Sequence, residues 1–282
     1  MNRVVDALTS PTLKHLRARW WDDDFTAFIR DTVQPRPGQR ILDVGCGTGT
    51  AEVKLSRLRI SQLTVVAVDL LIDKVMQARA TAQAHNMPVN LAAADACALP
   101  FGDASFDSAF CVAVLQHIRD VSRAVQELAR VTRPGGRVVA VEPDNAGRYF
   151  FSSSEAGRRA YDSAGQFFAT LAQARGDSRD SAVGPQLPGL FAQCGIEPIR
   201  VHLFPVSRAQ LGAPAASVWE ERRAAVRAAA DGAPDEAIRR LGRDYLKVLD
   251  RYAEEASAAG TAFVEIQNTM LFATVGQRAE RE

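Results

Sequence analysis

The sequence predicts an α/β fold built on a mostly parallel sheet. The chain has 282 residues, of which 47% are hydrophobic and 24% charged, so a sizeable core can form. Between Arg40 and Pro143, short apolar runs alternate with helix-compatible segments. Such strand–helix–strand alternation predicts parallel strands joined by right-handed crossovers.

Five β-like runs fall in the first half of the chain. Most are nearly continuous in apolar residues, as expected for strands that are covered on both faces. They occupy residues 40–45, 63–70, 89–95, 106–114 and 136–143. Helices are expected between them, where apolar residues recur at helical spacing, at residues 52–58, 73–86 and 121–131.

The alternation of strands and helices breaks after Pro143. The next stretch is rich in Ser, Gly, Arg and aromatic residues and contains no clear strand. Further along, we expect a helix at 187–196 that ends at Gly195, and strands at 199–206 and 263–276.

These features predict an N-terminal helical segment, residues 1–39, and one α/β domain, residues 40–282. Helical insertions are expected in that domain at 144–186 and 207–260. A separate small helical domain is the alternative.

Charge and cysteine usage narrow the class of protein. The chain has 34 Lys and Arg residues and 33 Asp and Glu residues, so its net charge of +1 gives no electrostatic reason to expect a nucleic-acid partner. The four cysteines, Cys46, Cys97, Cys111 and Cys194, form no CxxC pair, and reduced thiols are expected. The N-terminus lacks the apolar core of a signal peptide, and no apolar run approaches the ~20 residues that span a bilayer. A cytoplasmic protein without a membrane partner is therefore expected.

The strongest chemical signal is the segment ILDVGCGTGT, residues 41–50. A β-run that contains Asp43 is followed by Gly45, Gly47 and Gly49, and then by a helix. Glycine permits a sharp turn and close approach of a ligand. Dinucleotide-binding enzymes usually have GxGxxG instead, and an aspartate before the first glycine suits a ligand with an ammonium or sulfonium group. A tight β–α connection without a ligand is the alternative.

Two further aspartates end the next two β-runs. Asp69 ends VVAVD, where a carboxylate can accept hydrogen bonds from two ribose hydroxyls. Asp95 can accept from an adenine amino group while the backbone N–H of Ala96 donates to the ring. Helix capping is the alternative for both aspartates.

Taken together, these motifs resemble the class I S-adenosylmethionine-dependent methyltransferase superfamily. The resemblance rests on ILDVGCGTG, VVAVD, AD-x-x-x-LPF, L-x-H and R-x-x-RPGG, in register over about residues 38–143. It is specific to the superfamily and says little about the substrate. It implies a Rossmann-like sheet of seven strands with the last one antiparallel, and it makes residues 40–282 the methyltransferase domain.

The resemblance also implies a site for S-adenosylmethionine and its product S-adenosylhomocysteine. The glycine loop would line the methionine part of this cofactor, with Asp43 facing its amino group. Asp69 would hold the ribose, and Asp95 the adenine edge. The full set of implied cofactor residues is Asp43, Gly45, Cys46, Gly47, Asp69, Leu70, Asp95, Ala96, Cys111 and Val112.

Methyl transfer from a sulfonium is an in-line displacement that needs alignment and exclusion of water rather than a general acid. A base is needed only when the acceptor must lose a proton. The candidate catalytic residues are His117, Glu142 and Asp144, with Tyr149 and His202 as further possible bases. A structural role is the first interpretation of His117. No metal site is expected.

The two insertions predict a helical lid over the carboxyl ends of the strands, because the ligand crevice of an open α/β sheet lies there. Trp21, Tyr149 and Tyr161 are the candidate substrate-binding residues, and Trp20 belongs to the same N-terminal stretch as Trp21. Aromatic rings that only hold the insertion onto the sheet are the alternative.

A small-molecule acceptor and a monomer or homodimer are expected. One alternative function is methylation of tRNA or protein, which no NPPY-like motif and no basic extension supports. Another is cofactor binding without methyl transfer.

Overall fold

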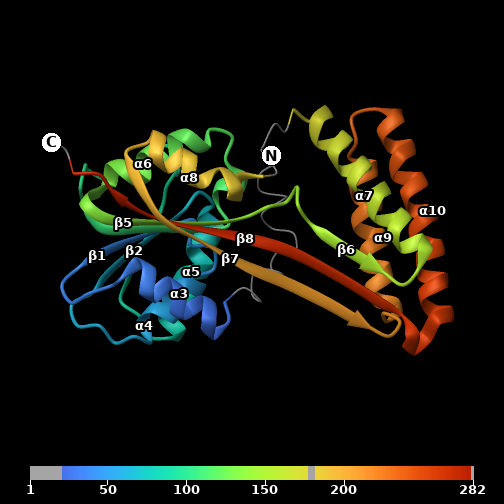
Figure 1. The fold of residues 1–282 in the computed structure, drawn as a ribbon, viewed down its shortest axis with the longest axis horizontal. Coiled ribbons are helices and arrows are strands. Elements are labelled where there is room, and N and C mark those ends of the chain that lie inside the picture. Colours follow the sequence, from blue (N-terminus) through green and yellow to red (C-terminus); the bar gives the residue numbers. More distant parts are fainter. Residues whose placement is uncertain (1–20, 177–181, 281–282) are drawn as a thin grey trace. The chain divides into compact units, whose positions relative to one another are not determined.

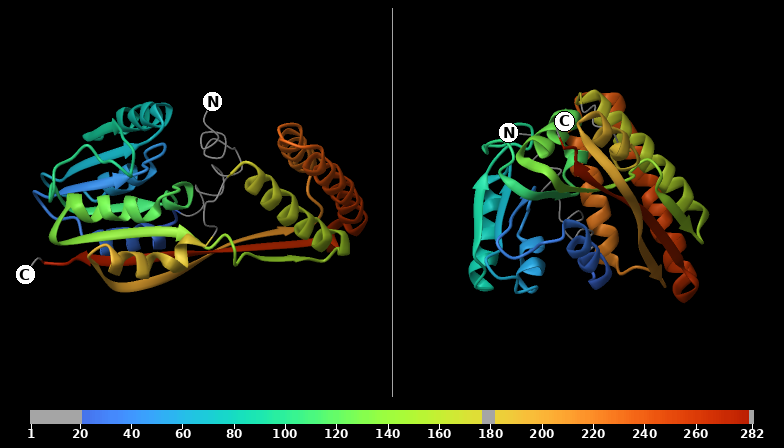
Figure 2. Two further views of the ribbon diagram at one scale, coloured as in Figure 1. Left: turned by 90° about the horizontal axis from the view of Figure 1, so that it is seen from above. Right: turned by 60° about the vertical axis from the view of Figure 1, so that its left-hand side comes forward.

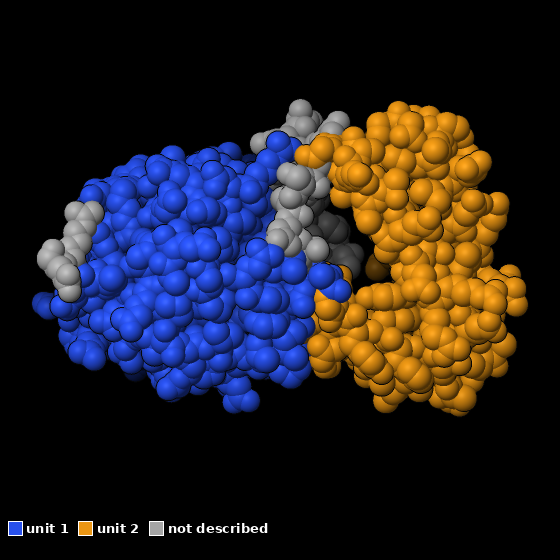
Figure 3. All heavy atoms as spheres, turned by 45° about the horizontal axis from the view of Figure 1, so that its top comes forward, with its two compact units in different colours: residues 1–146, 180–206, 270–282 blue, residues 147–179, 207–269 orange. Residues whose placement is uncertain are grey.

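The computed structural model describes residues 21–176 and 182–280 (Figure 1). The chain divides into two compact units, shown in different colours in Figure 3. Unit 1 comprises residues 1–146, 180–206 and 270–282, and unit 2 comprises 147–179 and 207–269. Unit 1 contains the motifs that carry the predicted chemistry.

Unit 1 is built on a mostly parallel sheet in the order β3-β2-β1-β4-β5-β8. Its parallel strands are β1 (Arg40–Val44), β2 (Thr64–Asp69), β3 (Val89–Ala93), β4 (Phe106–Val112) and β5 (Thr132–Pro143). Strand β8 (Val264–Arg278) runs antiparallel to β5, and β7 (Ile196–Leu211) pairs with β8. The predicted Rossmann-like fold, parallel except for an antiparallel last strand, is confirmed.

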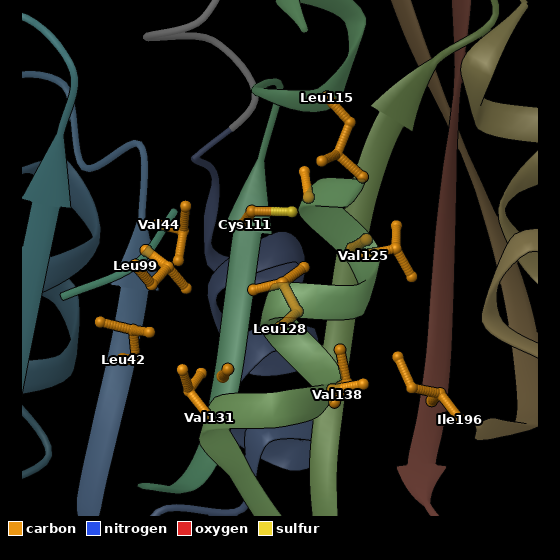
Figure 4. Packing of buried hydrophobic residues seen from close by; sticks show 14 of the residues in the cluster. Leu42, Val44, Leu99, Cys111, Leu115, Val125, Leu128, Val131, Val138 and Ile196 are labelled. Carbon is orange, nitrogen blue, oxygen red and sulfur yellow. The ribbon is translucent and has the colours of Figure 1, made fainter. Parts of the chain in front are cut away.

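Helices cover both faces of this sheet. Their bounds are α3 (Asp23–Val33), α4 (Thr50–Ser56), α5 (Ile72–Ala84), α6 (Val121–Val131) and α8 (Val183–Gln193). Helices α6 and α8 pack on one face, and α3 and α4 on the other (Figure 1). Figure 4 shows Val125, Leu128 and Val131 of α6 directed at the strands, beside Cys111 and Val138. Full burial of a side chain such as Leu128 contributes about 1.5–3 kcal/mol, so α6 fixes the ends of β4 and β5 firmly.

Unit 2 contains three long helices, α7 (Glu155–Ala174), α9 (Ala216–Asp231) and α10 (Glu236–Ala259), together with β6 (Tyr149–Ser152) and parts of β7 and β8. Helix α10 packs against both α7 and α9, and α7 and α10 can be followed side by side in Figure 2. The core between them is centred on Phe167, Trp219 and Tyr252.

The expectation that residues 144–186 contain no strand was wrong. Strand β6 pairs antiparallel with β8, with Tyr149 opposite Asn268 and Ser152 opposite Glu265. Its four residues, YFFS, are too few to show a period, although aromatic residues favour strands. The described part of the chain therefore has eight strands rather than the seven expected.

Two other boundaries differ from the prediction. Strand β7 continues to Leu211, beyond the expected end at residue 206, because it pairs with the long β8. Helix α8 begins at Val183 and ends at Gln193, before the predicted 187–196. Among the described helices, none is both long and apolar enough to cross a membrane.

Candidate functional site

The glycine loop after β1 turns sharply at the carboxyl edge of the sheet. The backbone N–H groups of Gly45 and Cys46 both donate to the carbonyl of Val68 at the end of β2, at 2.7 and 2.9 Å. Gly45 has a φ of +81°, and a Cβ there would lie 2.2 Å from Cγ2 of Val114. Glycine is therefore required for the loop to pack against the turn that follows β4.

Gly47 presents an open face of the backbone. Its φ is +58°, and no atom lies within 4 Å of the position that a Cβ would take. Its N–H donates to Oδ2 of Asp69 at 2.9 Å, and this hydrogen bond ties the loop to the end of β2. Gly49 then caps α4 without any side-chain hydrogen bond. A bare, fixed loop at a helix N-terminus is suited to close contact with a ligand.

Asp69 ties two loops together at the end of β2. One oxygen accepts from Gly47, and the other accepts from the N–H of Leu71 at 3.0 Å. The N-cap of α5 is Leu71, without a side-chain cap, so helix capping by Asp69 is wrong. Each carboxylate oxygen has two lone pairs, so acceptor capacity for ribose hydroxyls remains. Leu70 beside it is 51% exposed.

Asp95 lies in a tight turn after β3. Its Oδ1 accepts from the N–H of Cys97 at 2.8 Å, and Asp95 bridges to Ala98. No helix begins there, so helix capping is wrong for this aspartate too. Asp95 is exposed and Ala96 is half-buried, which leaves both at the surface of the turn.

Helix α6 fixes the loop that follows this turn, a feature that sequence reasoning missed. Glu127 accepts from the N–H of Leu99 at 2.8 Å, and Arg130 donates to the carbonyls of Leu99 and Phe101 at 3.0 and 2.7 Å. Glu127 and Arg130 pair with each other at 2.8 Å. The spacing E-x-x-R, which places both side chains on one side of a helix, was the available signal.

Glu52, in the first turn of α4, is another residue that sequence reasoning missed. It is 2% exposed and lies against Asp43, which is 3% exposed. Burial and the neighbouring carboxyl of Glu52 raise the pKa of Asp43 well above its usual range. Burial also raises the pKa of Glu52. A loop with a buried acid pair beneath it favours a cationic ligand group.

The thiols of both cysteines in the predicted site, Cys46 and Cys111, have a raised pKa. Burial, followed by the charges of Asp43 and Glu52, raises the pKa of Cys46. Burial also raises the pKa of Cys111, which is fully buried in β4. Neither is therefore a nucleophile at neutral pH. Val112 is half-buried at the end of the same strand.

Glu142 lies inside β5, not after it, and holds the turn beyond β4. Its carboxylate accepts from the N–H groups of Val114 and Leu115 at 2.7 and 2.8 Å, and from Gln116 at 3.3 Å. The side chain is fully buried. Because its oxygens are committed to backbone donors, the geometry gives Glu142 a structural role, and we do not carry it forward as a base.

The other candidate bases lie in different surroundings. His117 is half-buried at the end of the 3₁₀ turn η1 (Leu115–His117). Asp144 accepts from the N–H of Ala146 at 2.9 Å, and its neighbour Asn145 donates to Gln116 of η1 at 2.9 Å. His117 and Asp144 therefore lie on two loops that a hydrogen bond joins.

His202 is separate from these loops. It lies on β7 under α3, where its ring centroid is 4.7 Å from that of Phe28. Burial and the charge of Arg200 lower its pKa. The geometry indicates a packing role for His202.

The candidate substrate residues fall in different units. Trp21, in unit 1, packs edge-on against Phe25 with ring centroids 5.1 Å apart. Tyr149 and Tyr161, in unit 2, are 57% and 39% exposed. Tyr161 stacks on Phe150 at 4.6 Å. Trp20 lies outside the described residues, and the lid remains a prediction.

No group of three or more His, Cys, Asp and Glu side chains within residues 21–176 and 182–280 could hold a metal ion. The four cysteines are free thiols.

Comparison with known proteins gives the family. A family model described as a methyltransferase domain matches residues 42–140. An O-methyltransferase from Aspergillus nomiae is 32% identical over 153 residues, which cover 50% of this chain and 68% of the relative. An O-methyltransferase from Penicillium expansum is 31% identical over 153 residues, 50% of this chain and 55% of the relative. A demethylmenaquinone methyltransferase from Renibacterium salmoninarum is 33% identical over 135 residues, which cover 48% of this chain and 52% of the relative.

Overall, the matches span about half the length of most of these curated relatives. Solved structures share the fold at lower identity. The (4+2)-cyclase SpnF has a TM-score of 0.53 at 21% identity and covers 92% of this chain and 81% of its own. A phosphoethanolamine N-methyltransferase from Haemonchus contortus, in complex with S-adenosylhomocysteine, has a TM-score of 0.55 at 18% identity. The match covers 98% of this chain and 59% of the methyltransferase. The glycine loop, the strand order and the matched relatives agree, and the chain belongs to the class I S-adenosylmethionine-dependent methyltransferase superfamily.

Proposed function

We propose that the protein transfers a methyl group from S-adenosylmethionine to a small-molecule acceptor. The observation that carries this proposal is the glycine loop, where Gly47 has an open backbone face and donates its N–H to the carboxylate of Asp69. The residues around it fit the three parts of this cofactor. Asp43 offers a buried carboxylate to the ammonium, Asp69 has spare lone pairs for the ribose, and the Asp95 turn lies exposed for the adenine.

When bound, the cofactor supplies an electrophilic methyl group on a sulfonium. The chain's own contribution is then to orient the two reactants and to exclude water. The segment at residues 114–116, which leads from β4 into η1, is well suited to orientation, because Glu142 anchors its three consecutive backbone N–H groups. His117 and Asp144 are the remaining candidates for a base when the acceptor carries a proton.

The acceptor class is proposed from two observations. Relatives at 31–33% identity are named O-methyltransferases and a demethylmenaquinone methyltransferase. The chain also lacks the excess positive charge that favours a nucleic-acid substrate, since its net charge is +1. Both favour a small acceptor over tRNA.

The test is transfer of labelled methyl from S-adenosylmethionine in three parallel assays. One contains a panel of phenols, hydroquinones, carboxylic acids and amines, one contains bulk tRNA, and one contains protein extract. We expect label in a small-molecule product only. Label in tRNA or protein would instead establish a macromolecular acceptor.

A second candidate function is cofactor binding without methyl transfer. The observation that favours it is the shared fold of the (4+2)-cyclase SpnF, whose name describes a different reaction. Binding of S-adenosylhomocysteine without transfer to any of the three substrate classes would support this alternative.

A further inference from the structure

Ala113 has a backbone conformation that alanine rarely adopts. It follows β4 directly, and its φ of +58° lies in the left-handed region. The residue is buried, at 2% exposed. Its N–H donates to the carbonyl of Val141 at 2.8 Å, which continues the pairing of β4 with β5. A left-handed alanine persists only where its surroundings hold it, and such strain gathers at functional sites.

The three residues after Ala113 direct their backbone N–H groups at one carboxylate. Oε1 of Glu142 accepts from Val114 and Leu115 at 2.7 and 2.8 Å, and Oε2 accepts from Gln116 at 3.3 Å. Val114 returns to the right-handed region, with a φ of −113°. Successive N–H groups in such a turn form a concave anion site. Here the anion is a fully buried side chain of β5, so Glu142 stabilises the left-handed conformation of Ala113.

This turn touches the glycine loop through the side chain of Val114. A Cβ on Gly45 would lie 2.2 Å from Cγ2 of Val114 and 3.0 Å from Cγ1, so both methyl groups lie against the backbone of Gly45. The position of Val114 depends on how the chain leaves Ala113. A change of Ala113 to an ordinary conformation would move Val114 away from Gly45 and leave one side of the glycine loop without support.

We propose that Glu142 and Ala113 are positioning residues for the cofactor: the carboxylate keeps Ala113 left-handed, and the resulting turn keeps Val114 against the glycine loop. This inference rests on the proposed function, in which that loop binds the methionine part of S-adenosylmethionine. Glu142 acts through the backbone of residues 114–116 and not by contact with the ligand. A loop that is already fixed in its binding conformation costs less free energy to occupy.

The experiment compares two ligands by calorimetry on the full chain. S-adenosylhomocysteine reaches the glycine loop with its amino-acid end, whereas 5′-methylthioadenosine has the same adenosine part and lacks that end. Glu142→Gln keeps the size of the side chain but places an amide NH₂ where a carboxylate oxygen accepted an N–H. We expect this variant to bind S-adenosylhomocysteine about tenfold more weakly. 5′-Methylthioadenosine should bind within about twofold of its affinity for the unmodified chain.

Ala113→Gly distinguishes positioning from general support of the fold. Glycine adopts the left-handed region as readily as the right-handed one, so it needs no carboxylate to keep it there. The loss of S-adenosylhomocysteine affinity caused by Glu142→Gln should therefore be about threefold smaller in the Ala113→Gly background than with alanine present. The matched control is Glu265→Gln, the same change at a buried carboxylate of unit 2, which should leave the ratio of the two dissociation constants unchanged.

A Glu142→Gln variant that binds S-adenosylhomocysteine normally, or that loses affinity equally for both ligands, would overturn the inference and leave the proposed function intact. So would an equal loss in the Ala113→Gly background. If the unmodified chain does not bind S-adenosylhomocysteine at all, the proposed function fails and this inference with it.

If Glu142→Gln does not fold, Val114→Ala decides. This variant keeps the backbone and removes the two methyl groups that lie against Gly45. It should weaken S-adenosylhomocysteine about threefold and leave 5′-methylthioadenosine nearly unchanged. Absence of that selective loss would overturn the inference.

Discussion

Both units bury carboxylates, but the partners of these carboxylates differ. In unit 2, Glu265 is 2% exposed and accepts from both terminal nitrogens of Arg222, at 2.8 and 3.0 Å, and from the hydroxyl of Tyr252 at 2.6 Å. Burial alone would raise the pKa of Glu265, but the Arg222 guanidinium lowers it below its usual range. In unit 1, Asp43 and Glu52 are equally buried, and burial and mutual repulsion raise the pKa of Asp43.

The difference separates structural acids from acids that suit a ligand. Glu265 has every partner it needs within its own unit, as Glu142 has in the turn beyond β4. No positively charged group acts on Asp43 in the Asp43–Glu52 pair, and the pair flanks the glycine loop, where Gly47 has an open backbone face. Satisfied buried charges hold a fold together, whereas an unsatisfied pair at a loop points to a missing partner.

Breaking the satisfied pair should have the largest effect. Arg222→Met leaves Glu265 buried without its cation, and we expect a loss of about 3–5 kcal/mol in the free energy of unfolding. The matched control is Arg223→Met on the same helix, whose partners Glu220 and Asp250 are exposed, with an expected loss within about 1 kcal/mol. Denaturant unfolding measures both. Equal, small losses would show that the Glu265 network contributes no more than a surface pair.

Asp69 lies between the satisfied Glu265 and the Asp43–Glu52 pair. Its carboxylate accepts from two backbone N–H groups and keeps lone pairs that a ligand can use. Asp69→Ala should weaken binding of S-adenosylhomocysteine by about 1–3 kcal/mol, because ribose hydroxyls lose a charged acceptor and Gly47 loses its anchor. Calorimetry on a variant shown to be folded measures this. An unchanged dissociation constant would restrict Asp69 to holding the loop.

Removing one carboxyl group from the Asp43–Glu52 pair should have the smallest effect on stability. It should raise the free energy of unfolding, whereas Arg222→Met lowers it. Because the folded-state pKa of Asp43 is raised, the neutral form is favoured in the native state. Stability of the ligand-free protein should therefore fall as pH rises above about 4, the carboxyl value in the unfolded chain.

Asp43→Asn removes this penalty. We expect the variant to gain about 1 kcal/mol at pH 7 without ligand and to lose part of the decline with pH. Thermal unfolding at pH 5 and pH 7 measures both quantities. A destabilised variant with an unchanged pH slope would mean that Asp43 is a satisfied structural acid after all.

The parts of the fold that the sequence predicted well are those with a strong local pattern. Strands β1, β2, β4 and β5 are buried on both faces and appear as apolar runs, and α6 matches its predicted bounds of residues 121–131. Strand β6 and the extension of β7 were missed because their pairing with β8 defines them, and half of their residues face outward. Pairing between distant segments leaves no period in the sequence.

The same distinction holds for the site. Glycine spacing and strand-end aspartates predicted the loop, Asp69 and Asp95 as candidate site residues from local motifs alone. Glu52, Glu127 and Arg130 were missed because their roles depend on contacts with other elements. Glu142 was identified by its position at a strand end, but its three backbone donors, which lie 26–28 residues away in the chain, could not be predicted.

The most direct test of the central claim, that the glycine loop and its acids form a site for S-adenosylmethionine, is a calorimetric titration of the full chain with S-adenosylhomocysteine and, separately, with NAD. We expect saturable binding of S-adenosylhomocysteine and no heat from NAD, because the buried acids Asp43 and Glu52 next to the GxGxG loop would repel a pyrophosphate. Tight binding of NAD with no response to S-adenosylhomocysteine would contradict it.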